Sequence, residues 1–147
     1  MKTLLLLSAL FALSFAASTT QWATCDAAPA DTLIQPINVT LIRDEKEPKI
    51  TITLCGKAKE NIHIHGNSIQ VFIAGHQYVF EEHRLYYGWG SKLINAGQEF
   101  CHDSLSIGYY DYPADYVFKV NLRDDNDQDL NCFNVNMTVQ KSTQLSF

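Results

Sequence analysis

Apolar and polar residues alternate along several segments of this chain, and alternation with a period of two is typical of β-strands that bury one face. The clearest segments are 37–41, 50–54, 69–73, 116–122 and 133–139, with Tyr78 and Phe80 following a break at Gly75. The last two segments flank the acidic stretch 124–129, so we expect them to form a hairpin with a polar loop. No segment repeats its apolar residues as a convincing amphipathic helix would. The pattern therefore predicts an all-β fold, a sandwich of packed sheets.

Residues 1–18 break this pattern. A basic residue at position 2 precedes an apolar run over 4–13 and a group of small residues that ends at position 18. This is the order of a secretory signal peptide, and we expect cleavage after Ala16 or Ser18, which leaves a single domain over 19–147. The chain would then enter the secretory route and be secreted or reach the lumen of an endosome or lysosome.

The charge of the remaining domain restricts its partners. Removal of Lys2 leaves ten basic against sixteen acidic residues, a net charge of −6. Such a charge opposes non-specific binding to nucleic acid and to strongly anionic membranes. No apolar run after the leader reaches the roughly 20 residues needed to cross a bilayer. Any membrane contact is therefore expected to be transient.

Four cysteines, Cys25, Cys55, Cys101 and Cys132, lie in the mature part of the chain. An even number of cysteines in an oxidising compartment predicts two disulfides, and their number alone allows three pairings. A bond between Cys25 and Cys132 would close nearly the whole domain. In the chain-entropy model such a bond stabilises the fold by about 4–5 kcal/mol.

Two N-glycosylation sequons begin at Asn38 and Asn136. Both asparagines fall on the strand positions that the alternation assigns to solvent, where a bulky glycan must point. The sequons therefore agree with the assignment of faces, and they predict glycans at these two positions.

Three stretches form a connected pattern: WATCD over 22–26, a strand over 50–56 that ends in glycine, and YPADY over 112–116, which leads through Leu122 and Asp124 to Cys132 and Phe133. Together they resemble the ML, or MD-2-related lipid-recognition, domain over nearly all the mature chain. Within that family the chain most resembles the small phosphatidylglycerol/phosphatidylinositol transfer proteins, which are related to the Niemann-Pick type C sterol carriers.

This resemblance implies an immunoglobulin-like β-sandwich of two antiparallel sheets, a lipid cavity between the sheets, and a bond between Cys25 and Cys132. Relatives usually close a short loop with a cysteine shortly before the one that Cys101 resembles, but 86–100 contains none. We therefore expect a rearranged second bridge from Cys55 to Cys101, with two unpaired thiols as the alternative.

The cavity would be lined by inward positions of the predicted strands, whose apolar side chains shelter acyl chains or a sterol from water. These positions are Val71, Ile73, Phe80, Phe118, Val120, Phe133 and Val135. Tyr86, Tyr87 and Trp89 stand beside glycines, and such aromatic residues favour the membrane surface, so this loop is a candidate entrance. The alternative is an ordinary loop whose aromatic residues fold back on the core.

The sequence predicts no enzyme, no cofactor and no metal site. His63 and His65 share one face of a strand, but two ligands are too few and the other histidines lack a matching spacing. The acidic stretch 124–129 lacks the central glycine and the final glutamate of an EF-hand, so it is interpreted as a solvated hairpin tip. No serine or cysteine lies in a nucleophile motif.

Two functions are compatible with these features. The first is a soluble, monomeric carrier that binds a lipid and transfers phosphatidylglycerol or phosphatidylinositol between membranes, with sterol as the alternative ligand. The second is a secreted recognition module that has a filled core and binds another protein.

Overall fold

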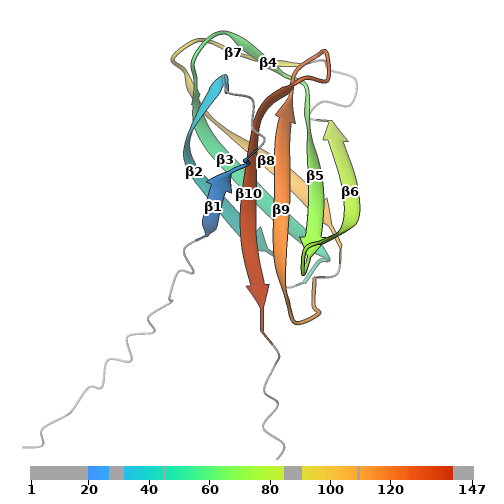
Figure 1. Cartoon of the computed structure of the whole chain (residues 1–147). Coiled ribbons are helices and arrows are strands. Elements are labelled where there is room, and N and C mark those ends of the chain that lie inside the picture. Colours follow the sequence, from blue (N-terminus) through green and yellow to red (C-terminus); the bar gives the residue numbers. More distant parts are fainter. Residues whose placement is uncertain (1–19, 27–31, 45, 85–90, 109, 141–147) are drawn as a thin grey trace, which may run out of the picture.

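The computed structural model describes residues 20–26, 32–44, 46–84, 91–108 and 110–140, with the backbone alone for 79–84 (Figure 1). Every regular element within these ranges is a strand, so they contain no helix that could cross a bilayer. The strands are β1 (Gln21–Thr24), β2 (Ile34–Arg43), β3 (Lys49–Ala58), β4 (Ile62–Ile64), β5 (Gly66–Ile73), β6 (His76–Arg84), β7 (Lys92–Ile94), β8 (Glu99–Ile107), β9 (Ala114–Arg123) and β10 (Asp129–Val139).

The strands form two large antiparallel sheets and one short pair. The first sheet has the order β1-β10-β9-β5-β6, the second has the order β2-β3-β8, and β4 pairs with β7. Figure 1 shows the two large sheets face to face, with the five-stranded sheet in front and the β4–β7 pair across one end. The predicted all-β sandwich of antiparallel sheets is therefore confirmed.

Each predicted alternating segment lies within a strand. Segments 37–41 and 50–54 belong to β2 and β3, 69–73 to β5, and the last two to β9 and β10. The hairpin between β9 and β10 is confirmed, and its tip is closed by Asp124, whose Oδ1 accepts hydrogen bonds from the backbone N–H groups of Asn126 and Gln128 at 2.8 and 2.9 Å. The acidic stretch is thus a hairpin tip held by its own first carboxylate.

The core lies between the two large sheets. Its fully buried side chains are aliphatic on the three-stranded sheet and mixed aliphatic and aromatic on the other; among them are Val39, Ile50, Ile52, Leu54, Ile69, Val71, Tyr116, Phe118, Val120, Leu122, Phe133 and Val135. Tyr110, from the β8–β9 connection, packs edge-to-face on Tyr116 and Phe118 with ring centroids 5.5 and 5.3 Å apart. This aromatic group fills the end of the core next to that connection.

Among the described side chains, one hydrogen-bonded pair crosses the core. Nε2 of His102 in β8 lies 3.4 Å from Oδ1 of Asn67 in β5, and the two residues are 6% and 2% exposed. Burial penalises the charged imidazole and lowers the pKa of His102 from 6.5 to about 4, while Asp103 acts to raise this pKa and Lys92 to lower it. Because an amide oxygen only accepts hydrogen bonds, the neutral imidazole carries its proton on Nε2 and donates it to Asn67.

Both disulfides follow the predicted pairing. Cys25, directly after β1, is bonded to Cys132 in β10, 107 residues along the chain. Cys55 and Cys101 are bonded as directly opposite residues of the β3–β8 ladder. The rearranged second bridge is therefore confirmed.

Removing either bridge tests these pairings. The two bonds close loops of 107 and 46 residues, and because loop entropy grows slowly with length, each loss should lower the free energy of unfolding by about 2–5 kcal/mol. The measurement is urea unfolding of the double variants Cys25→Ser/Cys132→Ser and Cys55→Ser/Cys101→Ser. Non-reducing peptide mapping provides the control, and a peptide that joins Cys25 to Cys55 would contradict the scheme.

Acid should weaken the fold through His102. The imidazole stays neutral in the native protein down to about pH 4 but is protonated in the unfolded chain below 6.5. The free energy of unfolding should therefore fall as the pH drops through this window, by up to about 3 kcal/mol. We expect His102→Gln, whose amide still reaches Asn67, to lose less stability on acidification than the wild type does. His76→Gln, at the exposed start of β6, is the control; equal acid sensitivity of all three proteins would refute the assignment.

Candidate functional site

The predicted lipid-contacting residues form adjacent rows on the inner face of the five-stranded sheet. Val71, Phe118 and Val135 are cross-strand neighbours in β5, β9 and β10. The next row contains Val120 and Phe133, together with Ile69, which the sequence-based set omitted. The alternation therefore placed five of its seven residues on one continuous apolar surface.

These five side chains are packed closely in the core. Val71, Phe118, Val120 and Val135 have no accessible surface, and Phe133 is 1% exposed. A side chain without accessible surface lines no space large enough for a water molecule. A lipid among these residues would therefore require the two sheets to move apart or the side chains to rearrange.

The remaining predicted residues lie at the end of β5, in β6 and in the segment that follows β6. Ile73 is half-buried at the end of β5. Phe80 lies in β6 opposite Gln70, and its side chain is outside the described residues. The proposed entrance residues Tyr86, Tyr87 and Trp89 also lie outside the described residues.

The facing sheet presents two kinds of inner surface. In β3 the inward residues Ile50, Ile52 and Leu54 are apolar and buried, whereas β8 directs Ser104 and Ser106, as well as His102, into the core. β8 contacts β5 and β6 across the sandwich, and β2 contacts β10. The polar inner residues are thus gathered on one side of the molecule, opposite β5.

Sequence reasoning missed this polar group. β8 escaped prediction because its inward residues are mostly polar, so no alternation of hydrophobicity marks the strand. The inward position of Asn67 could have been predicted, because this residue lies two positions before Ile69 in a predicted strand and therefore faces the same side.

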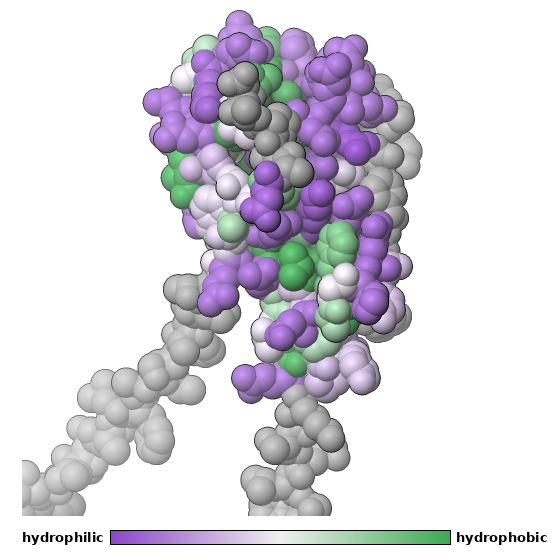
Figure 2. Space-filling model, viewed as in Figure 1, coloured by the Kyte–Doolittle hydropathy of each residue, from purple (hydrophilic) through white to green (hydrophobic). Residues whose placement is uncertain are grey.

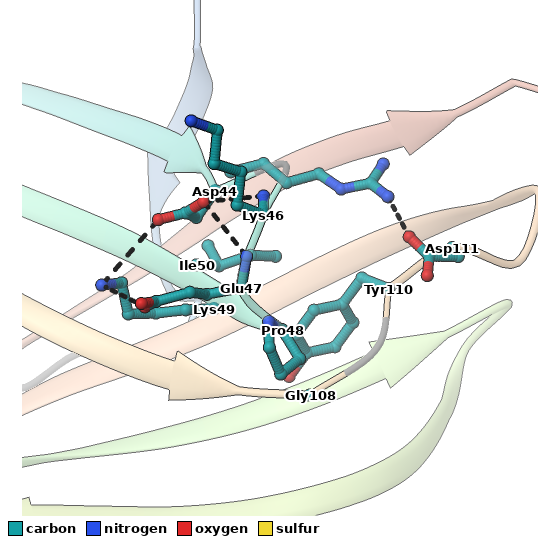
Figure 3. Close-up of a pocket in the computed structure, with 10 residues that line it drawn as sticks. Asp44, Lys46, Glu47, Pro48, Lys49, Ile50, Gly108, Tyr110 and Asp111 are labelled. Carbon is teal, nitrogen blue, oxygen red and sulfur yellow. Dashed lines mark hydrogen bonds and ion pairs between the residues drawn. The ribbon is translucent and has the colours of Figure 1, made fainter.

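A pocket of about 150 Å³ opens at the end of the sandwich where β2 turns into β3 (Figure 3). Its wall carries an ion pair between Arg43 and Asp111 and a second between Lys49 and Glu47 at 3.1 Å. Asp44 accepts backbone hydrogen bonds in this turn, which lower the pKa of its carboxyl group. With paired charges and a volume below the 300 Å³ or so of typical ligand pockets, this pocket does not accommodate a lipid.

A second pocket, of about 220 Å³, lies at the opposite end beside the β9–β10 hairpin. Its apolar part consists of Leu33, Ile62 and Leu130, and its rim carries His63 and Asp125 among other polar residues. Like the first pocket, it is smaller than typical ligand sites.

His63 and His65, the two histidines considered as metal ligands, both lie next to Asp125 on the rim of this pocket. Nδ1 of His63 and of His65 lie 3.8 and 3.6 Å from the two carboxylate oxygens of Asp125, and Ser91 Oγ donates to the same carboxylate at 3.0 Å. Among the described side chains no group of three or more histidine, cysteine or acidic residues is arranged to hold a metal ion. The described contacts of this cluster link β4, the start of β7 and the hairpin tip.

The two sequon asparagines lie on the outer faces, as the alternation predicts, but the inward position predicted for Ile37 is wrong: this residue lies at an irregularity of the β2–β3 ladder and is 54% exposed. Asn38 and Asn136 are both exposed, on β2 and β10 respectively. Figure 2 shows that the outer face of the five-stranded sheet is largely hydrophilic, with hydrophobic residues gathered over its lower half. Both acceptor asparagines are therefore open to modification, and the glycans themselves remain a prediction.

Comparison with known proteins identifies the fold. No protein-family model and no curated protein matches this sequence. Among solved structures, chicken MD-1 complexed with lipid IVa resembles the chain with a TM-score of 0.53 and 14% identity, over 80% of this chain and 87% of that one.

Weaker similarities extend to two further structures. A Niemann-Pick type C2 protein from the Japanese carpenter ant has a TM-score of 0.47 and 8% identity, over 82% of this chain and 99% of its own. Spo0M, a sporulation control protein from Bacillus subtilis, has a TM-score of 0.45 and 14% identity, over 74% of this chain and 50% of its own. The likeness to MD-1, together with the topology described above, shows that this chain has an ML-like, immunoglobulin-type β-sandwich fold.

Proposed function

We propose that this protein binds a lipid between its two large sheets and carries it between membranes. The observation that carries this proposal is the continuous apolar surface of rows Val71–Phe118–Val135 and Ile69–Val120–Phe133, on a fold shared with a protein whose structure contains lipid IVa. Apolar chains taken up against this surface would leave water, with a gain of about 0.8 kcal/mol for each buried methylene.

The two sides of the sandwich differ in how they are joined. On the β10 side, the backbone N–H of Leu33, just before β2, donates to the carbonyl of Leu130 at 3.3 Å, and the backbone N–H of Leu41 in β2 donates to Oγ1 of Thr20, just before β1, at 3.2 Å. On the other side, the described hydrogen bond across the core is the contact between Asn67 and His102 at 3.4 Å. Separation on the β8 side would break fewer of the described bonds, so we propose this side as the route of the lipid.

We propose phosphatidylglycerol or phosphatidylinositol as the cargo, with sterol as the alternative. The contacts offered by the rows are apolar and non-directional, so they suit any of these lipids. A carrier shields the lipid chains from water and needs no bond to be made or broken. Two disulfides fit an oxidising compartment, which supports a site of action outside the cell or in the lumen of an endosome or lysosome.

A recognition module with a filled core is the second candidate. It is favoured by the close packing of the inner rows and by an apolar patch on the outer face of the three-stranded sheet. Ile42, Leu105 and Ile107 are 63%, 39% and 61% exposed there, and Thr51 lies between Ile42 and Leu105 in the ladder. Exposed apolar patches of this kind often contact other proteins.

Lipid extraction tests the carrier directly. Organic extraction of the natively purified protein, followed by mass spectrometry, should release a stoichiometric lipid. The protein should also speed exchange of labelled phosphatidylinositol or phosphatidylglycerol between vesicles without altering the lipid. Phe118→Ala should lower lipid retention about tenfold because it removes inward contact area. Val117→Ala, the outward neighbour on β9, is the matched control, and Phe118→Leu should give a smaller loss in the same direction.

Three results would count against this proposal. An extract without lipid, together with no exchange, would favour the recognition module. Lipid hydrolysed in proportion to protein would indicate catalysis. Equal retention by Phe118→Ala and Val117→Ala would place the ligand away from the inner rows.

A further inference from the structure

The side-chain amide of Asn67 has a donor that the described protein leaves unused. Its Oδ1 accepts from His102, but its Nδ2 has no hydrogen-bond partner among the described residues, although Asn67 is only 2% exposed. Buried amide groups almost always have partners, and an unpaired one destabilises the protein until an acceptor reaches it. The unpaired Nδ2 therefore marks a place in the core where an acceptor oxygen would be stabilised.

We propose that Asn67 binds an uncharged oxygen atom of the lipid, either an ester carbonyl or a hydroxyl group, and that His102 holds the amide in position for this bond. The inference rests on the proposed function, because the oxygen must arrive between the sheets. It adds a directional contact to a site whose other contacts are apolar.

The location of Asn67 fits the polar end of such a ligand. Asn67, Ile69 and Val71 are successive inward residues of β5, and a strand covers roughly 13 Å from the first to the last. A lipid whose oxygen meets Asn67 would extend its apolar body over Ile69 and Val71 and across the rows already described. The polar atom and the apolar surface thus follow each other along one strand.

The facing strand strengthens the polar character of this position. His102, Ser104 and Ser106 are successive inward residues of β8, and all three are buried. The hydroxyl of Ser106 already bonds to that of Tyr110 at 2.5 Å. Polar side chains therefore face β5 along one side of the core, while the neighbouring strand β3 is apolar.

The charge of the site selects an uncharged oxygen. Burial keeps His102 neutral at pH 7, and the amide of Asn67 carries no charge, so the pair offers a hydrogen bond without a counter-ion. An anionic phosphate would lose its hydration here and gain no compensating charge from these two groups. We therefore place a phosphate head group outside this contact.

Among the described residues, Asn131 and Asn121 also have a buried amide atom without a partner, but each side chain has a local role. Asn131 accepts a hydrogen bond from the backbone N–H of Leu122 beside the irregular start of the β9–β10 ladder. Asn121 donates to the carboxylate of Asp129. Asn67 differs because its one described bond crosses between the sheets.

Pairs of ligands that differ in a hydroxyl group or in carbonyl oxygens test the proposal; the oxygen-bearing member of each pair is the one that has these groups. The first pair is cholesterol and 5-cholestene, which lacks the hydroxyl group. The second is phosphatidylinositol with ester-linked or ether-linked chains, since an ether oxygen is the weaker acceptor. The wild type should prefer the oxygen-bearing member of one pair by about tenfold, which corresponds to about 1.4 kcal/mol. The pair that shows the preference identifies the source of the oxygen.

Variants and NMR spectra test whether Asn67 causes this preference between the two ligands of a pair. Asn67→Leu should bind both members of that pair equally, and the double variant Asn67→Leu/His102→Leu, which removes both partners of the buried hydrogen bond, should do the same without loss of stability. In the wild type, the side-chain amide NMR signal of Asn67 should shift with the oxygen-bearing ligand, while that of Asn121 stays in place. Lipid binding without preference in either pair, or a preference that survives Asn67→Leu, would overturn this inference and leave the carrier standing. Failure of the wild type to bind any of the four lipids would overturn both.

Discussion

The burial of one apolar face of each large sheet against the other is the constraint on which the rest of this structure depends. Because side chains alternate across a strand, burying Val71, Phe118 and Val120 settles which neighbours face solvent. The exposed positions of Asn38 and Asn136 follow from the same parity. A slip of one residue in any ladder would exchange the two sets, so the core and the outer surface are specified together.

The contact between Asn67 and His102 is the exception to this apolar core. It links β5 to β8, and because burial disfavours the charged imidazole of His102, the fold becomes sensitive to acid. It also leaves one amide donor without a described partner. A core selected for stability alone would favour an apolar pair at this position. The proposed recognition of an oxygen atom in a ligand would give this polar pair a function.

The bonds that join the sheets are distributed unevenly. The Leu33–Leu130 and Leu41–Thr20 hydrogen bonds lie on the β10 side, whereas Asn67 and His102 lie on the side of β8. Each disulfide joins neighbouring strands within one sheet, so both leave the spacing between the sheets free to change. A sandwich with more bonds along one side can separate along the other, which is the movement that the proposed uptake of a lipid would require.

The sequence by itself determined the strands whose inward residues are apolar, the β9–β10 hairpin and the outward sequons, because these depend on local alternation. It could not reveal β8, whose inward residues His102, Ser104 and Ser106 are polar, nor the order of strands in the sheets. The partner of Asn67 was decided by tertiary structure, since the two strands belong to different sheets and 35 residues separate Asn67 from His102. The close packing of the inner rows also depends on tertiary structure, because it is set by the distance between the two sheets. No pattern of residues within one strand determines that distance.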